Sequence, residues 1–344
     1  MIRFAPLAVA TALLAATGAA HGQAGADFSP PRTPAGNPDF QGVWTNASIT
    51  KIERPPEFDS LVITTEEARQ WERDAASVAA EDQARTDPSE GAPEAGEEPA
   101  GYNFFWIDPG KTVGNINGEY RSSWITDTPN GRVPYTPAGR VAMMKPLATF
   151  NSYNNPEERI PIERCIIGFG STGGPPMLNA LYNNHHQFIQ TEDAIAINVE
   201  MIHDTRIIRM DGEHNPPEID QYLGTSVGHW EGDTLVVETR GFKELEAVRV
   251  DFGVFIYIAP TATVTERFTL ISDDQFLYQF TVEDETAYTQ PWKGELVFRR
   301  SPDKLYEYAC HEGNYSVPNI LGGASAIERE GRTRARTTGI GRLD

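Results

Sequence analysis

Apolar and polar residues alternate along most of the chain between residues 183 and 310. Successive side chains of a β-strand point to opposite faces, so this period of two predicts a series of short strands. Turn-forming pairs such as Gly232-Asp233 separate these strands. We expect strands at 183–191, 194–202, 205–211, 225–230, 233–241, 261–271, 276–284, 293–300 and 304–310.

Helical patterns do not interrupt this series, which predicts that neighbouring strands pair as antiparallel hairpins. Several strands are partly apolar on both faces, and closure of the sheet would remove its exposed edges. The fold class that we predict is therefore mainly β: an antiparallel up-and-down β-barrel with a few peripheral helices. We expect an interior that is mixed, apolar and acidic, and that holds one small ligand.

The remaining elements are expected outside this series. A capping box of Thr64 with Glu67 predicts a helix over 64–84. Two further helices are expected at 137–145 and 316–330, and the strand-like segment 42–46 is a candidate additional barrel strand.

The chain begins with a pattern typical of a secretory signal peptide, because Arg3 precedes an apolar core that is followed by small residues. No later segment is apolar for long enough to span a bilayer, so we expect a periplasmic or secreted protein without membrane insertion. We divide the chain into a signal peptide (1–24), an N-terminal extension whose helices and acidic loop pack on the barrel (25–150), the β-barrel domain (151–330) and a flexible tail (331–344).

The two cysteines, Cys165 and Cys310, fit an oxidising compartment, where the simplest expectation is one disulfide. The alternative is a cysteine nucleophile, since His311 follows Cys310 directly. A catalytic cysteine and histidine usually meet in space rather than as sequence neighbours, so we favour the disulfide.

The formal net charge is −20 over 344 residues. This charge argues against nucleic acid or an anionic membrane surface as a partner, because both attract lysine and arginine. We therefore expect a small-molecule ligand as the partner. The sequence does not indicate an oligomeric state.

Ionisable residues gather in the central stretch from Glu200 to Gly241. A carboxylate beside a histidine can orient it for acid–base catalysis. We predict that His203 acts as acid or base, that Asp204 or Glu200 orients it, and that Arg206 stabilises developing negative charge. The alternative is an ion-pair network that closes a tight turn.

Further polar and aromatic residues are expected to form the substrate-binding wall. His229 and Trp230 end a strand before a hairpin, where the alternative is an aromatic packed on the core. The complete set of predicted substrate-binding residues is His186, His229, Trp230, Glu238, Glu266, Trp292, His311 and Tyr315.

Zinc or iron remains an alternative, because His186, His203, His229 and His311 with Glu200 or Glu312 offer suitable ligands. No pair of these residues has the spacing of a known metal motif. We predict neither a metal nor an organic cofactor.

Several runs resemble a family of exported bacterial proteins that mostly lack an assigned function. They are Gly42-Val43-Trp44, HDTR at 203–206, GHWEGDTLVVET at 228–239, ERF at 266–268 and YEYACHEGNY at 306–315. The resemblance implies an exported, lipocalin-like β-barrel, and it implies no catalytic residues.

These observations favour an exported enzyme that uses histidine and carboxylate acid–base chemistry in a barrel pocket. Its reaction would be of the lyase, isomerase or hydrolase type, on a small and largely apolar molecule. The alternatives are a lipocalin-like carrier without catalysis and a structural component of an envelope complex.

Overall fold

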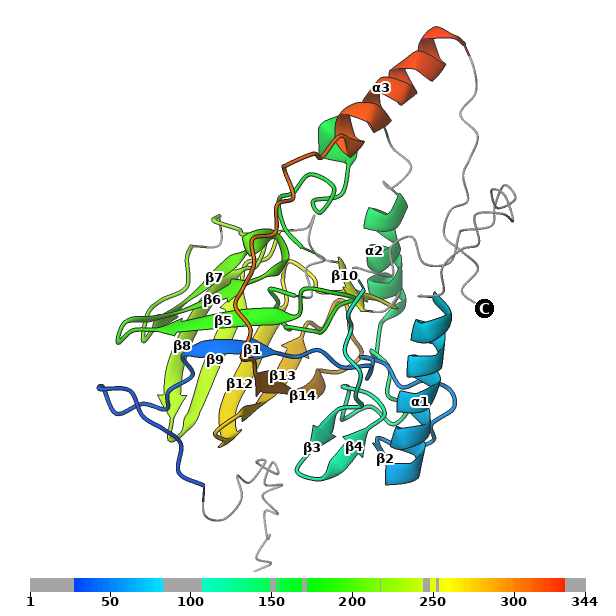
Figure 1. Ribbon diagram of the computed structural model, residues 1–344. Coiled ribbons are helices and arrows are strands. Elements are labelled where there is room, and N and C mark those ends of the chain that lie inside the picture. Colours follow the sequence, from blue (N-terminus) through cyan, green and yellow to red (C-terminus); the bar gives the residue numbers. More distant parts are fainter. Residues whose placement is uncertain are drawn as a thin grey trace, which may run out of the picture.

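A closed β-barrel forms the centre of the computed structural model (Figure 1). The structure describes residues 28–82, 107–148, 153, 155–168, 172–216, 218–243, 248–251 and 254–331. Within these ranges, nine strands close the barrel in the order β1-β14-β13-β12-β9-β8-β7-β6-β5. They are β1 (Gly42–Thr45), β5 (His185–Gln190), β6 (Ala194–Val199), β7 (Thr205–Met210), β8 (Thr225–Glu231), β9 (Thr234–Arg240), β12 (Thr263–Ser272), β13 (Gln275–Glu283) and β14 (Trp292–Arg300).

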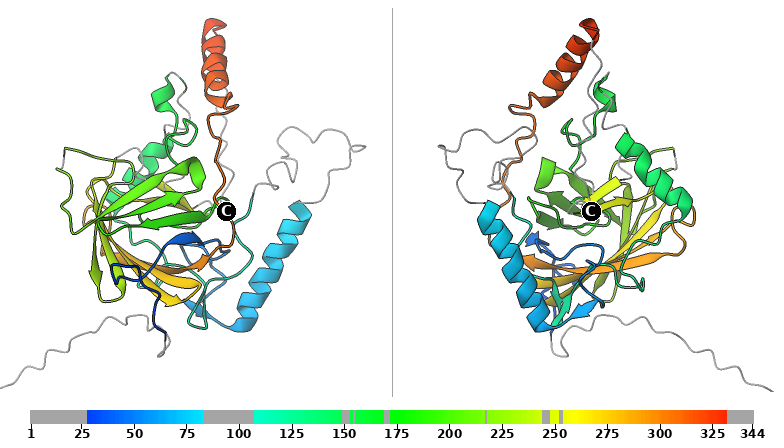
Figure 2. Two further views of the ribbon diagram at one scale, coloured as in Figure 1. Left: turned by 60° about the vertical axis from the view of Figure 1, so that its left-hand side comes forward. Right: turned by 90° about the vertical axis from the view of Figure 1, so that its right-hand side faces the viewer.

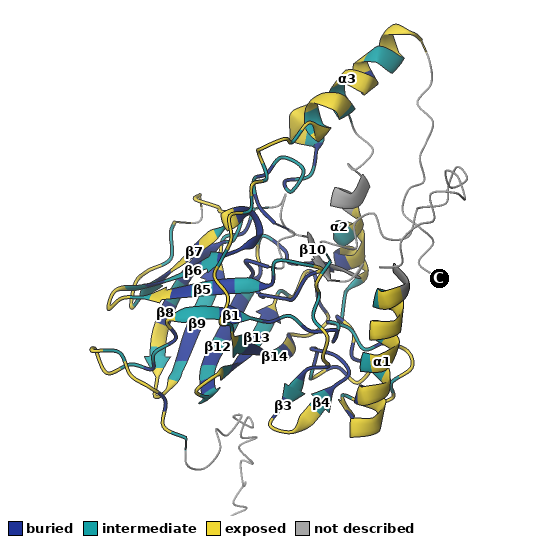
Figure 3. Ribbon diagram, viewed as in Figure 1, coloured by how far each residue is buried: buried dark blue, intermediate teal, exposed yellow. Residues whose placement is uncertain are grey.

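The alternation in the sequence matches burial strand by strand. In β12, every second residue from Val264 to Leu270 is buried, while those between them are partly exposed. Figure 3 shows the same change from buried to half-buried positions along the barrel strands. The mainly β barrel predicted from the sequence is therefore confirmed, and segment 42–46 contributes one of its strands, β1.

Aromatic side chains fill the barrel interior. The rings of Phe276 and Phe298 stack with centroids 4.7 Å apart, and Trp44 meets Phe276 edge-on at 4.9 Å. The buried segment 172–180 covers this interior, since the Met177 amide donates to the Tyr278 hydroxyl at 2.9 Å. The described interior is thus packed with side chains, where the sequence led us to expect a ligand chamber.

Most neighbouring strands pair as the predicted antiparallel hairpins, but β7 and β8 pair in parallel. Parallel neighbours cannot be joined by a tight turn, because the chain must return to the starting end of the sheet. The described residues 211–216 and 218–224 belong to this return, and we call them the crossover.

Two further differences concern strand positions. In the chain, β9 is followed by a hairpin of β10 (Val248–Asp251) and β11 (Val254–Tyr257) before β12 begins, and no strand was predicted there. This hairpin forms a separate two-stranded sheet. The predicted strand at 304–310 is instead irregular and mostly exposed, since no neighbouring strand pairs with it in the structure.

The N-terminal extension packs against one outer side of the barrel (Figures 1 and 2). Ile116 contacts Leu277 and Val297 on the outer faces of β13 and β14. The capping box is confirmed, because the Glu67 amide donates to the Thr64 hydroxyl at 3.2 Å. The elements here are β2 (Val62–Ile63), α1 (Thr65–Asp82), β3 (Asn115–Ile116), β4 (Glu119–Arg121) and α2 (Pro137–Ala148).

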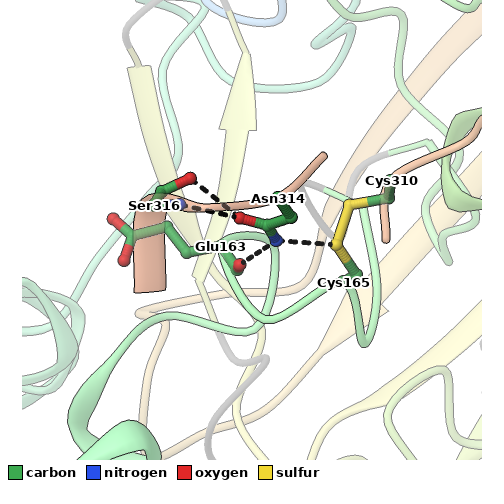
Figure 4. The surroundings of a disulfide bond; sticks show 5 residues. All are labelled: Glu163, Cys165, Cys310, Asn314 and Ser316. Atoms are coloured by element: carbon green, nitrogen blue, oxygen red, sulfur yellow. Dashed lines mark hydrogen bonds between the residues drawn. A yellow bond between two sulfur atoms is a disulfide. The ribbon is translucent and has the colours of Figure 1, made fainter. Parts of the chain in front are cut away.

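The predicted disulfide between Cys165 and Cys310 is present. Figure 4 shows Asn314 beside it, donating to the Glu163 carbonyl at 3.1 Å and to the Cys165 sulfur at 3.2 Å. These contacts hold the start of α3 (Ser316–Arg329), which projects away from the barrel (Figures 1 and 2). Two short 3-10 helices, η3 (Pro156–Glu158) and η4 (Met201–His203), complete the described elements.

The predicted signal peptide lies outside the described residues. Among the helices that are described, none combines the length and the apolar character that crossing a membrane requires.

One ion pair is buried inside the barrel. The Arg206 guanidinium donates to both carboxylate oxygens of Glu266, and the two side chains are 1% and 0% exposed. Arg206 also donates to Ser226 at 2.9 Å and to Thr239 at 3.2 Å, and the Tyr278 hydroxyl donates to Glu266 at 2.7 Å. Every charged atom is therefore matched, as burial of charge requires.

Replacing Arg206 by alanine should lower the free energy of unfolding by about 3–5 kcal/mol, because Glu266 would remain buried without a cation. The double variant Arg206→Met/Glu266→Leu should recover most of this loss. Urea unfolding measures both effects.

The matched control is Arg267→Ala on β12, the strand that carries Glu266, where the partly exposed pair with Glu231 is worth at most about 1 kcal/mol. Equal losses for Arg206→Ala and Arg267→Ala would contradict the structural role assigned to the buried pair.

Candidate functional site

A cleft of about 580 Å³ lies at the parallel seam between β7 and β8. This volume is in the range of small-molecule sites, which is roughly 300–1,000 Å³. We call it the seam cleft. Its lining residues are Ile166, Ile167, Asp204, Thr205, Arg206, Ile207, Arg209, Asn215, Asp220, Gln221, Tyr222, Leu223, Gly224, Thr225, Ser226 and Lys243.

The seam cleft exists because the crossover runs back outside the barrel wall. His214 holds the crossover to the barrel, contacting the Thr225 carbonyl at 3.1 Å and Glu238 at 3.0 Å. Farther along, the Gln221 amide donates to the Gly241 carbonyl at 3.0 Å. The crossover is thereby attached to the barrel at His214 and at Gln221. The seam cleft is the space between the crossover and β7.

The turn that delivers Asp204 to the cleft has an unusual backbone. Ile202 and His203 are consecutive residues with φ of 56° and 47°. For a β-branched residue such as Ile202, this left-handed conformation is a clear outlier. Such strain typically costs about 1–3 kcal/mol per residue and is concentrated at functional sites. Buried Met201 and Ile202 anchor the turn in the core.

Asp204 is the most perturbed carboxyl group of the cleft. Burial raises its pKa to about 6, against the opposing effects of the Gly168 amide and of His203. The Gly168 N–H donates to the Asp204 carboxylate at 3.1 Å. A carboxyl group with this pKa can accept or donate a proton near neutral pH.

The disulfide supports the wall of the seam cleft that lies beside this turn. Ile166 and Ile167 line the cleft directly after Cys165, and Gly168 follows with its hydrogen bond to Asp204. The bond from Cys165 to Cys310 therefore fixes the segment that contacts the acid.

The four predicted catalytic residues are not gathered in one place. Asp204 and Arg206 line the seam cleft. Glu200 is buried and contacts His185 at 3.0 Å, and this hydrogen bond raises the pKa of His185. His203 is exposed and does not line the cleft, although it is close enough to lower the pKa of Asp204.

The Arg206 guanidinium is enclosed in the structure and donates to Glu266, Ser226 and Thr239, so it reaches no ligand in this arrangement. Its role in the structure is the ion-pair network that was the alternative interpretation.

Four of the predicted substrate-binding residues lie in or against the core. Glu266 pairs with Arg206. His186 donates from Nε2 to the Thr172 carbonyl at 2.8 Å, and burial lowers its pKa to about 4. Trp292 is buried against Phe280, and Trp230 is half-buried against Phe40.

The other four lie on the outside. His229 is exposed and contacts Glu231 at 3.3 Å. Glu238 contacts His214 and Arg240. His311 and Tyr315 are exposed near the disulfide.

Sequence reasoning missed several residues of the seam cleft: Arg209, Asp220, Tyr222, Thr225 and Lys243. The available signal was the length of the connection after residue 211, which is too long for a two-residue hairpin loop. The hydroxyl of Thr225 is buried there without a hydrogen-bond partner in the structure.

Within the described ranges, no group of three or more histidine, cysteine or acidic side chains is placed to hold a metal ion. No protein-family model, curated protein or solved structure gives a significant match to the chain. The family resemblance and the lipocalin-like character therefore stay predictions.

Replacing Asp204 by asparagine should stabilise the protein at neutral pH. The folded state holds the Asp204 proton more tightly than the unfolded chain, where the aspartate pKa is about 3.9. The contribution of Asp204 to the free energy of unfolding therefore falls as the pH rises from about 4 to about 6, and it stays constant above that pH.

The Asp204→Asn variant should be more stable than the wild type by about 1–2 kcal/mol near pH 7.5, after allowance for partial solvent screening. The gain should shrink as the pH falls toward about 4.5. Urea unfolding across this range measures it, with Asp273→Asn in an exposed turn as the control. A gain that does not depend on pH would contradict the burial of an ionisable Asp204.

Removing the disulfide with Cys165→Ser/Cys310→Ser should loosen the wall of the seam cleft. We expect the Gly168 amide to exchange its hydrogen about tenfold faster or more, because its segment loses a covalent anchor. Overall stability should fall by about 2–4 kcal/mol. Hydrogen exchange measures both, with the amides of β12 reporting the global change. Unaltered exchange at Gly168 relative to β12 would show that the disulfide does not support the cleft.

Proposed function

We propose that the protein is an exported enzyme that moves a proton to or from a small polar molecule bound in the seam cleft. Asp204 is the acid–base group in this proposal. The observation that carries it is a half-buried carboxyl group, with a pKa raised to about 6, in a cleft of about 580 Å³.

The chemistry suits an elimination or an isomerisation. Ionised Asp204 would take a proton from a carbon next to a carbonyl group, and the resulting carboxylic acid would return it to another atom of the substrate or to a leaving group. A positioned acid–base group of this kind typically contributes about 10²–10⁴-fold to the rate. Arg209 and Lys243, which line the same cleft, supply positive charge for the developing anion.

Two features support this location rather than the barrel interior. Packed aromatic rings occupy the described interior, whereas the cleft is open to solvent. The turn of Ile202 and His203 is strained immediately before Asp204. The lining is also more charged than the sequence led us to expect, so the proposed substrate carries a polar group.

The proposal that the protein is exported rests on the N-terminal sequence pattern and is supported by the disulfide, which is typical of oxidising compartments.

A binding protein without catalysis is the second candidate. The observation that favours it is that no histidine lines the described seam cleft, so Asp204 has no imidazole beside it to share the proton transfer. Ligand binding without turnover would then be the whole function.

Proton transfer is tested by solvent exchange. The purified protein is incubated in deuterium oxide with a panel of small ketones, keto acids and hydroxy acids, and proton NMR detects the loss of carbon-bound hydrogen. We expect exchange on at least one member, and a loss of about 100-fold or more in Asp204→Asn.

The control variant Asp273→Asn, with an exposed side chain, should retain full exchange. Full exchange in Asp204→Asn would remove Asp204 from the catalytic role. If the wild type binds panel members but exchanges none of their hydrogens, the second candidate function, a binding protein without catalysis, is favoured.

A further inference from the structure

Lys243 presents an available ammonium group to the seam cleft. The group lies 5.0 Å from the centroid of the Tyr222 ring and 3.8 Å from a carboxylate oxygen of Asp220. A separation of 3.8 Å exceeds the length of a hydrogen bond, so among the described residues Asp220 forms an ion pair with the ammonium group without accepting a hydrogen bond from it. The side chain is 37% exposed, which leaves room for a ligand to reach it.

The backbone fixes the position of this cation. The Lys243 amide donates to the Gln221 carbonyl at 3.0 Å, and the Gln221 amide donates to the Gly241 carbonyl at 3.0 Å. Lys243 is therefore tied to the crossover that forms one wall of the cleft, and its ammonium is held near that wall.

Arg209 adds a second positive charge to the cleft lining. Its guanidinium donates to the Glu213 carbonyl, which is a neutral group. The whole chain carries a formal charge of −20 and would repel anions. The same lining carries the carboxyl groups of Asp204 and Asp220, so its cations offset its acids, whereas the whole chain has a large excess of acids.

Apolar side chains line part of the cleft. Ile166 and Ile167 lie on the wall that the disulfide holds, and Leu223 lies on the crossover. Their presence beside two cations favours a ligand with an ionic end and an apolar body.

We propose that the substrate of the seam cleft carries an oxyanion, a carboxylate or a phosphate, that binds Lys243 while its apolar body contacts Ile166, Ile167 and Leu223. The inference takes the location of the site from the proposed function and adds the class of substrate. A lysine ammonium binds either kind of oxyanion as a point charge, with Arg209 strengthening the local positive potential.

Three probes test the charge requirement: benzoate, its neutral counterpart benzamide, and inorganic phosphate. Isothermal titration calorimetry gives each dissociation constant at low salt. We expect the wild type to bind benzoate about tenfold more tightly than benzamide, which is the effect of one charge-assisted hydrogen bond.

The variant Lys243→Met should bind benzoate no better than benzamide, and Lys243→Arg should keep the preference. The matched control is Lys293→Met on β14, which should behave as the wild type. Thermal unfolding of each variant confirms that it is folded. Phosphate binding that is lost in Lys243→Met, with no preference for benzoate, would assign the oxyanion to a phosphate rather than a carboxylate.

Equal binding of benzoate and benzamide by the wild type, without phosphate binding, would overturn the inference. So would a benzoate preference that survives in Lys243→Met. The proposed function and the oxyanion fail by different outcomes. Proton exchange on neutral ketones alone would keep the proposed function and reject the oxyanion. A preference for benzoate without any proton exchange would keep the oxyanion and reject the proposed function.

Discussion

The parallel pairing of β7 with β8 is the constraint on which the candidate site depends. Every other described neighbour in the barrel pairs in an antiparallel manner, and short connections suffice for most of them. At this one seam the chain must return along the barrel, so the crossover lies outside the wall and encloses a cleft. The site is thus a consequence of topology, and its charged side chains come from segments that the crossover brings together.

The barrel separates two kinds of polar group. Inside, Arg206 and Glu266 pair with each other and with their neighbours, so that both charges are matched. In the seam cleft, Asp204, Arg209 and Lys243 are only partly matched. For Asp204, burial with incomplete hydrogen bonding raises the pKa of the carboxyl group and keeps it reactive. The strained turn at Ile202 holds Asp204 in the second situation.

The sequence predicted what depends on local pattern. Alternation located the barrel strands, Thr64 and Glu67 located the start of α1, and two cysteines located the disulfide. It could not predict properties set by distant contacts. The segment 304–310 alternates like a strand, but no strand among the described residues pairs with it. The charge of Arg206 suggested chemistry, because the sequence does not show that Glu266 pairs with it. The cleft residues Tyr222 and Lys243 stood in segments without a recognisable motif, and only the parallel seam brings them near Asp204.

The central claim is that Asp204 is a partly buried acid poised near neutral pH in an open cleft. Carbon-detected NMR of the aspartate side-chain carboxyl groups, with Asp204→Asn used to assign the signal, measures this property directly. A titration midpoint of Asp204 at about 6 is the result that the structure predicts. A midpoint at about 4, the value of an aspartate in water, would contradict the account.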